Sequence, residues 1–370
     1  MASPVRIGII GVGFGTRAHI PAYQSEGLDV VAVCASHQER AQDAADRFGI
    51  PNAFADYHEM LRMDGLDAVT VAGPRPLHHA MTKAVLEAGK HVICEKPFTT
   101  TLEDAHELWR LAEDAGVTAM IAHEFRFSPA RARVKELIDE GYVGPLRTVI
   151  VNLARGEADK TGPGPWNPKG DAAEDGGGLL WSQGSHYIDG LRHWFGEINR
   201  VSGQVFTVDG ERSVEGSTKT TQATADDVFQ ATLGFADGGT AIMTMHYAAP
   251  FGEGARIEIY GDDGTLVTPQ PNASSPNPPP HPTLFGARVG EGPLAELPIP
   301  ERLDPYDDKG HDGLMPMRWL AKAFVRGIAD GVSPAPSFYD AYRLQQVMHA
   351  IRDSSATGRV IEILPITTSV

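Results

Sequence analysis

The stretch that decides the fold runs from Val5 to Thr16 and reads VRIGIIGVGFGT. Its first half is apolar apart from one arginine and one glycine, which is typical of a buried parallel strand. Gly11 allows a tight turn, Gly13 lets a pyrophosphate approach the backbone, and the following helix offers unpaired N–H groups and a positive dipole end. A third small residue usually stands at the position of Thr16, whereas here a glycine falls one place early, at Gly15. The turn predicts a dinucleotide site, although a lone glycine-rich turn after a strand is weak evidence.

Strands and helices alternate through the rest of the N-terminal third. The expected strands cover residues 28–34, 66–72, 91–94 and 117–122, and the expected helices cover residues 38–48, 78–88 and 101–115. The last of these helices opens with a near capping box at Thr101 and closes at Gly116. Strands that alternate with helices of this length predict a doubly wound parallel sheet. Residues 1–125 are therefore expected to form an α/β Rossmann domain.

A second motif follows the fourth expected strand, where residues 89–97 read GKHVICEKP. Lys96 would stand at the carboxyl edge of the sheet, where ligands bind in such folds. Its ammonium group would lie near the nicotinamide and a substrate oxygen, and both burial and the positive charge of oxidised nicotinamide would lower its pKa. Lys96 is thus the first catalytic candidate, while Glu95 would steady Lys96 or the cofactor and Pro97 would fix the turn. The alternative is an ordinary Lys-Pro turn at the surface.

The end of the second expected strand bears on the choice of cofactor. NAD enzymes usually place a carboxylate there to bind the ribose 2′-hydroxyl, but residues 35–40 read ASHQER. The hydroxyl of Ser36, the imidazole of His37 and the guanidinium of Arg40 suit a 2′-phosphate instead, because arginine pairs with phosphate oxygens. The sequence therefore favours NADP over NAD. In the alternative, Ser36 only caps the next helix and Arg40 is solvated.

Composition excludes several classes of protein. With 370 residues, two domains are expected, and a hydrophobic fraction of 42% can fill substantial cores. The net charge of −16 argues against nucleic acid and anionic membrane surfaces as partners. The two cysteines, Cys34 and Cys94, are expected to be buried reduced thiols, and no metal site is expected. Because Met1 leads almost directly into a strand and no stretch is apolar enough to span a bilayer, we expect a cytoplasmic protein.

The pattern changes beyond residue 126. A helix is expected at 130–140, and strands are expected at 146–154, 228–235, 240–247 and 255–260, with a hairpin turn at 236–239. Neighbouring strands joined by short turns predict an α+β domain, residues 126–370, with a large and mainly antiparallel sheet and helices on one face. Helices near 317–327 and 339–352 are expected to pack back near the first domain. Residues 269–282 read PQPNASSPNPPPHP and predict an exposed, partly extended loop.

Several motifs together resemble those of the Gfo/Idh/MocA oxidoreductases, the group that includes glucose–fructose oxidoreductase and inositol dehydrogenase. They are the glycine turn at 11–13, the Glu-Lys-Pro motif at 95–97, FRFSP at 125–129, GGG at 176–178, GSHYID at 184–189, FYD at 338–340 and SSATGR at 354–359. The resemblance covers nearly the whole chain. It implies a C-terminal sheet that is open on its other face, and a homo-oligomer formed through that face.

The resemblance also implies a second catalytic residue. The histidine that matches His186 is the usual general acid/base of the family, because imidazole titrates near the working pH. A carboxylate often stands four residues earlier, but here that position is Ser182. This departure makes His186 less basic or gives it a different partner. Asp189, one helical turn on, would either orient His186 or serve the structure. Outside such a motif a lone histidine is usually structural.

Other residues complete the expected site. Arg126 would contact substrate or cofactor, although the nearby Glu124 replaces an asparagine that the family often has. Trp166 would stack on a sugar ring or simply pack, and His78 would lie beside the cofactor or start a helix. The expected substrate contacts are Lys96, Arg126, Trp166, Ser182, His186 and Asp189. The expected cofactor contacts are Gly11, Gly13, Phe14, Gly15, Thr16, Ser36, His37, Arg40, Ala72, Pro74, His78, Glu95 and Lys96.

These residues predict an NADP(H)-dependent oxidoreductase that acts on CH–OH groups of a sugar, cyclitol or related polyol, with Lys96 and His186 handling the hydroxyl proton. One alternative is a redox-neutral hydrolase or lyase that uses tightly bound NAD(P) for transient oxidation. Another is a non-catalytic sensor of nucleotide and sugar with the same fold. Ser182 leaves room for the sensor, whereas the presence of Lys96 and His186 argues against it. The sequence names neither the substrate nor the direction of the reaction.

Overall fold

The computed structural model describes residues 4–155, 165–208, 210–247, 249–270, 283–306 and 314–366. The chain divides into two compact units, one made of Met1–Phe127 with Tyr306–Gln345 and the other of Ser128–Pro305 with Gln346–Val370. The first unit therefore takes in a segment from the C-terminal part of the chain. Most of the loop expected at 269–282 lies outside the described residues. No helix in the described part of the chain is long and apolar enough to cross a membrane.

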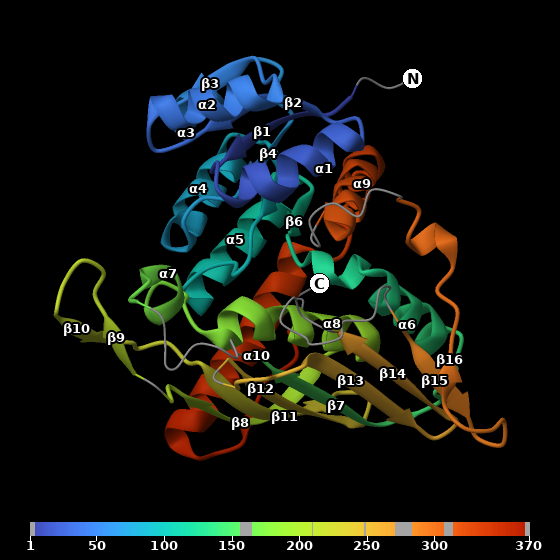
Figure 1. The fold of residues 1–370 in the computed structure, drawn as a ribbon. Coiled ribbons are helices and arrows are strands. Elements are labelled where there is room, and N and C mark those ends of the chain that lie inside the picture. Colours follow the sequence, from blue (N-terminus) through green and yellow to red (C-terminus); the bar gives the residue numbers. More distant parts are fainter. Residues whose placement is uncertain are drawn as a thin grey trace. The chain divides into compact units, whose positions relative to one another are not determined.

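The first unit is built on a parallel sheet. The strands lie in the order β3-β2-β1-β4-β5-β6 (Figure 1), so the direction of winding reverses between β1 and β4. The expectation of a doubly wound Rossmann domain is confirmed. In sheets of this kind, the carboxyl ends of the strands at the reversal flank the ligand crevice. The strands are β1 (Arg6–Ile10), β2 (Asp29–Cys34), β3 (Asn52–Phe54), β4 (Ala68–Val71), β5 (His91–Cys94) and β6 (Ala119–Ile121).

Most helices of the first unit begin and end close to the positions expected from the sequence. Among them, α5 begins where expected because the Thr101 hydroxyl accepts a hydrogen bond from the Asp104 N–H at 3.1 Å. The sequence analysis missed β3 and α3, which are too short to show a period. The helices are η1 (Gly15–His19, a π-helical turn), α1 (Ile20–Ser25), α2 (Gln38–Phe48), α3 (Tyr57–Leu61), η2 (Arg75–Leu77), α4 (His78–Glu87), α5 (Leu102–Ala115), η3 (Glu124–Phe127), α9 (Leu314–Asp330) and the first part of α10 (Phe338–Thr357).

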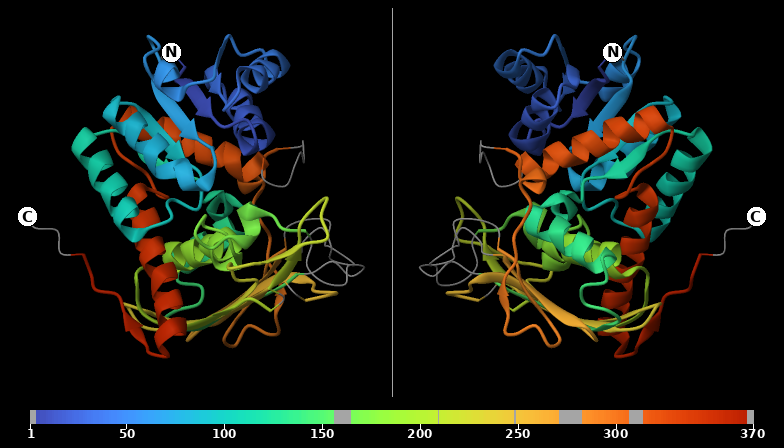
Figure 2. Two further views of the ribbon diagram at one scale, coloured as in Figure 1. Left: turned by 90° about the vertical axis from the view of Figure 1, so that its left-hand side faces the viewer. Right: turned by 90° about the vertical axis from the view of Figure 1, so that its right-hand side faces the viewer.

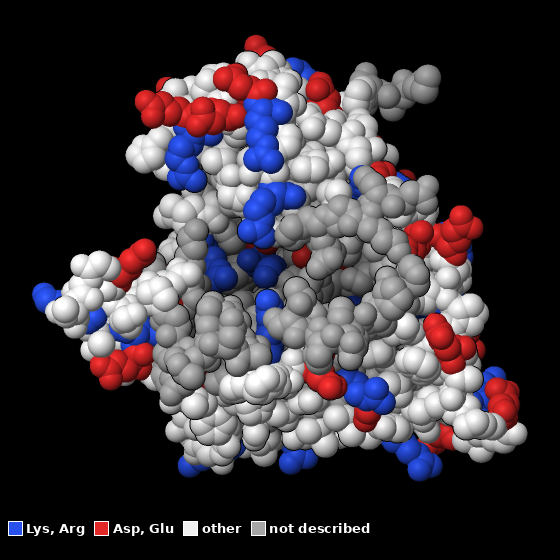
Figure 3. Space-filling model, in the orientation of Figure 1, with Lys and Arg blue, Asp and Glu red and all other residues white. Residues whose placement is uncertain are grey.

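The core of the first unit joins the sheet to α9. Ile7 and Ile9 of β1 and Met317 and Leu320 of α9 are fully buried in one apolar cluster. Each such side chain stabilises the fold by about 1.5–3 kcal/mol relative to an exposed position. Other charged residues lie at the surface, and Figure 3 shows acidic side chains (red) beside basic ones (blue) over α2.

The second unit is built on a larger sheet. In the described part of the chain, the strands lie in the order β16-β15-β14-β13-β7-β12-β11-β8-β17, and β7 and β12 form a parallel pair within a mainly antiparallel sheet. This mixed sheet confirms the expected α+β class. The strands are β7 (Leu146–Ala154), β8 (Ile198–Phe206), β11 (Val228–Phe235), β12 (Thr240–His246), β13 (Gly254–Gly261), β14 (Gly264–Gln270), β15 (Phe285–Arg288), β16 (Ala295–Glu296) and β17 (Ile361–Glu362).

The two faces of this sheet differ. Along β7, Val149, Val151 and Leu153 are buried, whereas the alternating Ile150 and Asn152 are exposed. The helices α6 (Pro129–Asp139) and α8 (Ser185–Phe195) lie on the buried face, as Figures 1 and 2 show. Buried and exposed residues therefore alternate along the strand, because helices cover only one face of the sheet.

Smaller elements complete the second unit. They are α7 (Pro168–Asp171), η4 (Leu180–Gly184), η5 (Glu301–Leu303), and the hairpin of β9 (Glu211–Ser213) and β10 (Thr220–Gln222). The tail motif SSATGR contacts strand β8. Ser354 Oγ accepts a hydrogen bond from Gly203 N–H, and Ser355 Oγ accepts one from Val205 N–H, both at 3.0 Å. These hydroxyls pair with two backbone N–H groups of β8 that would otherwise lack partners near the edge of the sheet.

Candidate active site

The glycine turn after β1 fits a dinucleotide. Gly11 has φ 107°, and a Cβ there would lie 2.2 Å from the Ala72 carbonyl oxygen, so only glycine is accommodated. A Cβ at Gly13 would meet nothing within 4 Å in the described structure, which leaves open space for a pyrophosphate against the backbone. A Cβ at Gly15 would lie 3.0 Å from Ile9 Cγ2, so this glycine brings η1 close to β1. The three glycines thus supply the turn, the phosphate approach and the close packing that such a site needs.

The residues beside the glycines are fixed by contacts within the turn. The Thr16 hydroxyl donates to the Val12 carbonyl oxygen at 2.8 Å, which closes the first turn of η1. The half-buried Phe14 ring lies edge-on to the His19 ring at 5.8 Å, with the Arg17 guanidinium 5.6 Å from the Phe14 centroid. Thr16 and Phe14 therefore shape the turn whether or not they also contact a cofactor.

The end of β2 presents the three expected side chains to solvent. Ser36, His37 and Arg40 are all exposed. The N-cap of α2 is His37 rather than Ser36, and within the described residues its side chain makes no capping hydrogen bond. The alternative in which Ser36 caps α2 is therefore not what the structure has.

The end of β4 is joined to the Lys96–Pro97 turn by a buried histidine. His78 Nδ1 lies 2.8 Å from the Pro97 carbonyl oxygen, and His78 Nε2 lies 3.1 Å from the Gly73 carbonyl oxygen. Burial lowers the pKa of His78, against the effect of these carbonyls and of Glu95. A neutral imidazole has one N–H, so His78 donates a hydrogen bond to one of these two carbonyl oxygens. Ala72 and Pro74 lie between the end of β4 and His78 in the chain.

Glu95 is held by the helix that follows the glycine turn. Its Oε1 lies 2.8 Å from His19 Nε2, and its Oε2 accepts a hydrogen bond from the Lys96 N–H at 3.1 Å. Burial alone would raise the pKa of the Glu95 carboxyl, but the hydrogen bond and charge of His19, with the charge of Lys96, hold it below its ordinary value. Glu95 therefore sets the backbone direction at Lys96.

Lys96 follows β5 at the carboxyl edge of the sheet and is partly buried. Its peptide bond to Pro97 is cis. Burial lowers the pKa of Lys96, the carboxylates of Glu124 and Glu95 oppose this, and Arg75 adds to it. The first unit thus gathers the glycine turn, Glu95 and Lys96 around the ends of β1, β4 and β5. A lysine whose pKa is lowered by burial at such a place is a candidate for proton exchange.

Arg126 has a structural contact. Its side chain is 3% exposed, and its Nη2 lies 3.4 Å from Asp340 Oδ1 at the start of α10. Asp340 also accepts a hydrogen bond from the Ser337 N–H at 2.8 Å. This pair explains the FYD motif as part of the fold of the first unit, and the substrate role of Arg126 stays a prediction.

In the second unit, Ser182, His186 and Asp189 follow one another along η4 and α8. Residues four and three apart lie on the same side of a helix, so these side chains share one face. His186 is 2% exposed and Asp189 is 1% exposed. The His186 carbonyl oxygen accepts a hydrogen bond from Arg131 Nη1 at 3.1 Å, which holds this helix to α6.

Trp166 lies by the β9–β10 hairpin. The backbone N–H of Trp166 donates a hydrogen bond to the Ser213 carbonyl oxygen at 2.7 Å, and the Trp166 side chain is half-buried. Stacking of Trp166 on a sugar ring stays a prediction.

Both halves of the chain match family models. The model described as "Oxidoreductase family, NAD-binding Rossmann fold" matches residues 5–123, and the model described as "GFO/IDH/MocA C-terminal domain" matches residues 132–267. The chain belongs to the Gfo/Idh/MocA family of oxidoreductases. The resemblance drawn from the sequence motifs is confirmed, and so is the expectation of an enzyme.

Relatives of this Gfo/Idh/MocA protein match over nearly their full length. An uncharacterized oxidoreductase of Synechocystis sp. is 31% identical over 92% of this chain and 91% of its own. Levoglucosan dehydrogenase of Pseudarthrobacter phenanthrenivorans is 27% identical over 97% of this chain and 98% of its own. A solved structure of levoglucosan dehydrogenase with NADH and L-sorbose has a TM-score of 0.86 at 26% identity, and the match covers 99% of this chain and 100% of that one.

Sequence reasoning overlooked two residues beside the predicted site of this Gfo/Idh/MocA protein. Tyr247 and Arg155 follow β12 and β7, and the Arg155 guanidinium carbon lies 5.8 Å from the Tyr247 ring centroid. Burial raises the pKa of the Tyr247 hydroxyl, and the side chains of Arg155, Ser182 and Gln183 oppose this rise. A tyrosine and an arginine at the ends of two strands are common, so the sequence carries no signal for this cluster. Only the parallel pairing of β7 with β12 brings them together.

A possible cation site also appears on the first unit. His79, Asp104 and Glu107 offer ligand atoms that all lie within 4.8 Å of one another. However, the Lys83 ammonium lies 2.6 Å from Glu107 Oε1 and already supplies a positive charge there. We assign no metal to this group.

Proposed function

We propose that this protein is an NADP(H)-dependent oxidoreductase that transfers a hydride between the nicotinamide and a secondary alcohol or carbonyl carbon of a sugar, cyclitol or related polyol. The observation that carries the proposal is the environment of Lys96, which lies partly buried just after β5. Burial lowers the pKa of Lys96, and the carboxylates of Glu124 and Glu95 oppose this. The relatives support sugars as the substrate class, since they include levoglucosan dehydrogenase, D-xylose 1-dehydrogenase and D-glucoside 3-dehydrogenase.

Lys96 binds the substrate oxygen in this proposal. In its charged form the ammonium donates a hydrogen bond that orients the alcohol, and in its amine form it takes up the hydroxyl proton. Its lowered pKa makes the amine form easier to reach than it is for an exposed lysine. Glu95 does not touch the substrate but fixes the Lys96 backbone through its carboxylate.

His186 is the second proton-handling group in the proposal. It is buried on α8, and the bond from Arg131 to its carbonyl oxygen fixes the helix that carries it. Lys96 belongs to the first unit and His186 to the second. A double-mutant cycle therefore tests whether the two act on one substrate, because only coupled residues give non-additive losses in kcat/KM.

The preference for NADP rests on the exposed Ser36, His37 and Arg40. Arginine and hydroxyl donors at this strand end would bind a 2′-phosphate, which a carboxylate would repel. Relatives differ in this respect, since D-xylose 1-dehydrogenase of Haloferax volcanii is named for NADP⁺, whereas levoglucosan dehydrogenase has been solved with NADH. The NADP preference is therefore our proposal for this chain.

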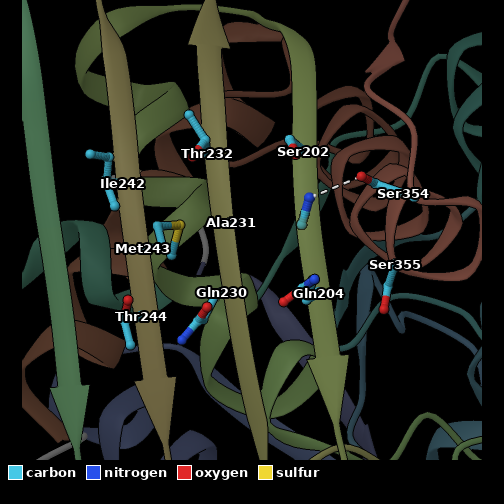
Figure 4. A pocket seen from close by; sticks show the side chains of 12 residues that line it. Ser202, Gln204, Gln230, Ala231, Thr232, Ile242, Met243, Thr244, Ser354 and Ser355 are labelled. Atoms are coloured by element: carbon cyan, nitrogen blue, oxygen red, sulfur yellow. Dashed lines mark hydrogen bonds between the residues drawn. The ribbon is translucent and has the colours of Figure 1, made fainter.

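We further propose a homo-oligomer formed through the open face of the second sheet. Ile150 is 36% and Ile242 is 47% exposed on this face, although both lie on central strands. A hollow of about 320 Å³ lies over β8, β11 and β12. Gln230, Thr232 and Thr244 are among its lining side chains in Figure 4. Light scattering tests this: Ile242→Arg should lower the molar mass, whereas Val289→Arg, on an exposed turn, should not.

The decisive experiment follows reduced-nicotinamide absorbance with a panel of sugars and cyclitols, using NADP⁺ and NAD⁺ separately. We expect turnover with NADP⁺, loss of turnover in Lys96→Ala with nucleotide binding largely preserved, and little change in Lys90→Ala. An active Lys96→Ala variant would refute the mechanism. Turnover with NAD⁺ alone would refute the role given to Ser36, His37 and Arg40. Product formation with no net change in cofactor redox state would favour the redox-neutral hydrolase or lyase.

A further inference from the structure

Two parallel strands end side by side in the second unit. β7 and β12 are paired in register up to Ala154 and His246. The residues that follow them are Arg155 and Tyr247, and the Arg155 N–H donates to the His246 carbonyl oxygen at 2.9 Å. The Arg155 carbonyl oxygen in turn accepts a hydrogen bond from the Ala249 N–H at 3.3 Å. The backbone at Arg155 is therefore fixed on both sides.

The same backbone framework fixes the start of the helix that leads to His186. The Asp227 carbonyl oxygen accepts a hydrogen bond from the Tyr247 N–H at 2.9 Å. Its neighbour Asp226 accepts two hydrogen bonds, both of 2.8 Å, where η4 begins. The Asp226 carbonyl oxygen accepts from Leu179 N–H, and Asp226 Oδ2 accepts from Leu180 N–H. One dipeptide thus positions both Tyr247 and the helix of Ser182.

Four side chains meet at this point, and we call them the Tyr247 cluster: Arg155, Ser182, Gln183 and Tyr247. Burial raises the pKa of the Tyr247 hydroxyl, and Arg155, Ser182 and Gln183 oppose this rise through their side chains. The Arg155 guanidinium carbon lies 5.8 Å from the Tyr247 ring centroid. Ser182 and Gln183 are partly buried, as is Tyr247, whereas Arg155 is exposed. A hydroxyl, a phenol, an amide and a guanidinium therefore converge, and all of them can donate hydrogen bonds.

The charge of this cluster is positive. Arg155 is the member of the cluster that carries a formal charge at neutral pH. The acidic neighbours have other cations: Asp226 Oδ1 lies 3.8 Å from Arg352, and Asp227 Oδ2 lies 3.9 Å from Arg212. The charge of Arg155 also acts on Tyr187. Burial raises the pKa of Tyr187, and the charges of Arg131 and Arg155 oppose that rise.

The cluster lies close to the proposed proton-handling residue. Ser182 and His186 are four residues apart across η4 and α8, which follow each other without a break. Side chains at this spacing are neighbours on one helix face. A substrate bound at His186 would therefore have the Tyr247 cluster about one helical turn away.

We propose that the Tyr247 cluster binds a carboxylate of the substrate, so that this enzyme acts on acidic sugars, such as uronates or aldonates, in preference to the neutral sugars. This inference rests on the function proposed for His186. A single guanidinium offers two parallel N–H groups that match one carboxylate, and neutral donors supply the remaining bonds. A phosphate dianion would favour more than one cation, so sugar phosphates serve as a contrasting substrate class.

The test compares D-glucuronate with D-glucose and D-galacturonate with D-galactose. The wild-type ratio of kcat/KM for acid over neutral sugar is expected to be about 10 or more, because a charged hydrogen-bonded contact is lost with the neutral sugar. Arg155→Gln should bring this ratio towards one, and Arg155→Lys should keep part of it. Arg256→Gln removes an exposed guanidinium on β13 that pairs with Glu258, and it should leave the ratio unchanged.

Binding without turnover separates this inference from the proposed function. Calorimetric titration of the protein with D-glucuronate should show binding that weakens with added salt and is reduced about 10-fold in Arg155→Gln. If no sugar is turned over but this binding is seen, the proposed function fails and the cluster stands. If neutral sugars or sugar phosphates are preferred, or Arg155→Gln affects acid and neutral sugars equally, the inference is overturned while the oxidoreductase function stands.

Discussion

His19 Nε2 lies 2.8 Å from Glu95 Oε1 in the interior of the first unit. His19 Nδ1 lies 2.9 Å from the Tyr23 hydroxyl, which lies 2.8 Å from Thr70 Oγ1. All four side chains are buried. They form a polar chain that ties the helix after the glycine turn to the strand end that carries Lys96. The glycine turn and Lys96 are therefore joined through buried hydrogen bonds.

His19→Gln is expected to destabilise the protein by about 3 kcal/mol, because removal of one partner leaves a buried charge on Glu95 without its counterpart. Urea unfolding measures the change. Tyr23→Phe is the matched control, since it removes a neutral hydrogen bond worth about 1 kcal/mol. Equal losses of unfolding free energy in the two variants would show that the His19–Glu95 contact stabilises the protein no more than the hydrogen bonding of the Tyr23 hydroxyl does.

The destabilisation in His19→Gln should depend on pH. The folded-state pKa of Glu95 lies below its ordinary value of 4.5, so its stabilising effect is fully present above pH 4.5 and is lost as the pH falls through the folded-state pKa. The difference in unfolding free energy between wild type and His19→Gln should therefore shrink in acid. Unfolding curves at pH 7 and at about pH 4 check this, and a constant difference would contradict it.

Glu124→Gln is expected to change the pH profile of activity. Burial lowers the pKa of Lys96, and the Glu124 carboxylate is the largest influence that opposes this. Its removal lowers that pKa further, so the rising limb of kcat/KM for alcohol oxidation should move to lower pH. Glu113→Gln, on the exposed side of α5, serves as the control. A limb that stays in place or moves to higher pH would exclude an action of Glu124 on Lys96.

Local patterns predicted most of the fold. The apolar run before Gly11 gave β1, and helix signals at Thr101 and Gly116 marked α5 almost to the residue. The missed elements, β3 and α3, are short, and the Asp56 cap that starts α3 accepts its hydrogen bond only once the chain has turned. Periodicity therefore identifies long elements, whereas short ones depend on contacts that a pattern does not contain.

The candidate site was less accessible from the sequence. Lys96 and Glu95 were visible because their motif follows a strand end, but the pairing of Glu95 with His19 joins residues far apart in the chain. Arg126 looked like a substrate contact, yet its partner Asp340 comes from the C-terminal helix. Tyr247 had no signal at all. Contacts of this kind depend on topology, which one sequence without relatives shows only in outline.

Gly11→Ala and Gly13→Ala should separate folding from nucleotide binding. A Cβ at Gly11 would lie 2.2 Å from the Ala72 carbonyl oxygen at a positive φ, so this variant should lose about 2 kcal/mol or more of stability. A Cβ at Gly13 would meet no described atom within 4 Å, so stability should be unchanged. Because that Cβ would fill the phosphate approach, the Kd for nucleotide should rise about 10-fold or more. Unaltered nucleotide affinity in Gly13→Ala would contradict the placement of the pyrophosphate.

Arg40→Ala tests the choice of cofactor. Loss of a guanidinium that pairs with a 2′-phosphate should raise the KM for NADP⁺ by about 10-fold or more and leave the KM for NAD⁺ within about 3-fold. Arg47→Ala is the control, since Arg47 is also exposed on α2 but lies in its last turn. Equal changes for both nucleotides would remove the support that Arg40 gives to NADP.

The serines of the tail should protect an edge of the second sheet. Ser354 Oγ accepts from Gly203 N–H and donates to the Arg359 carbonyl oxygen at 2.6 Å, so Ser354→Ala leaves two backbone groups without partners. We expect a loss of about 1–3 kcal/mol. Ser355→Ala removes one partner, from Val205, and should cost less.

The same variants expose the outer edge of β8 to another chain, because β17 pairs only with Val201 and Arg200. Edge strands with open donors associate with other strands. Ser354→Ala with Ser355→Ala should therefore aggregate faster than wild type at equal fraction unfolded, as measured by light scattering. Thr357→Ala, which removes a hydroxyl that donates to the Asp353 carbonyl oxygen on the exposed side of α10, is the control. Aggregation of the double variant no faster than that of Thr357→Ala would show that stability alone, and not edge protection, is the role of these serines.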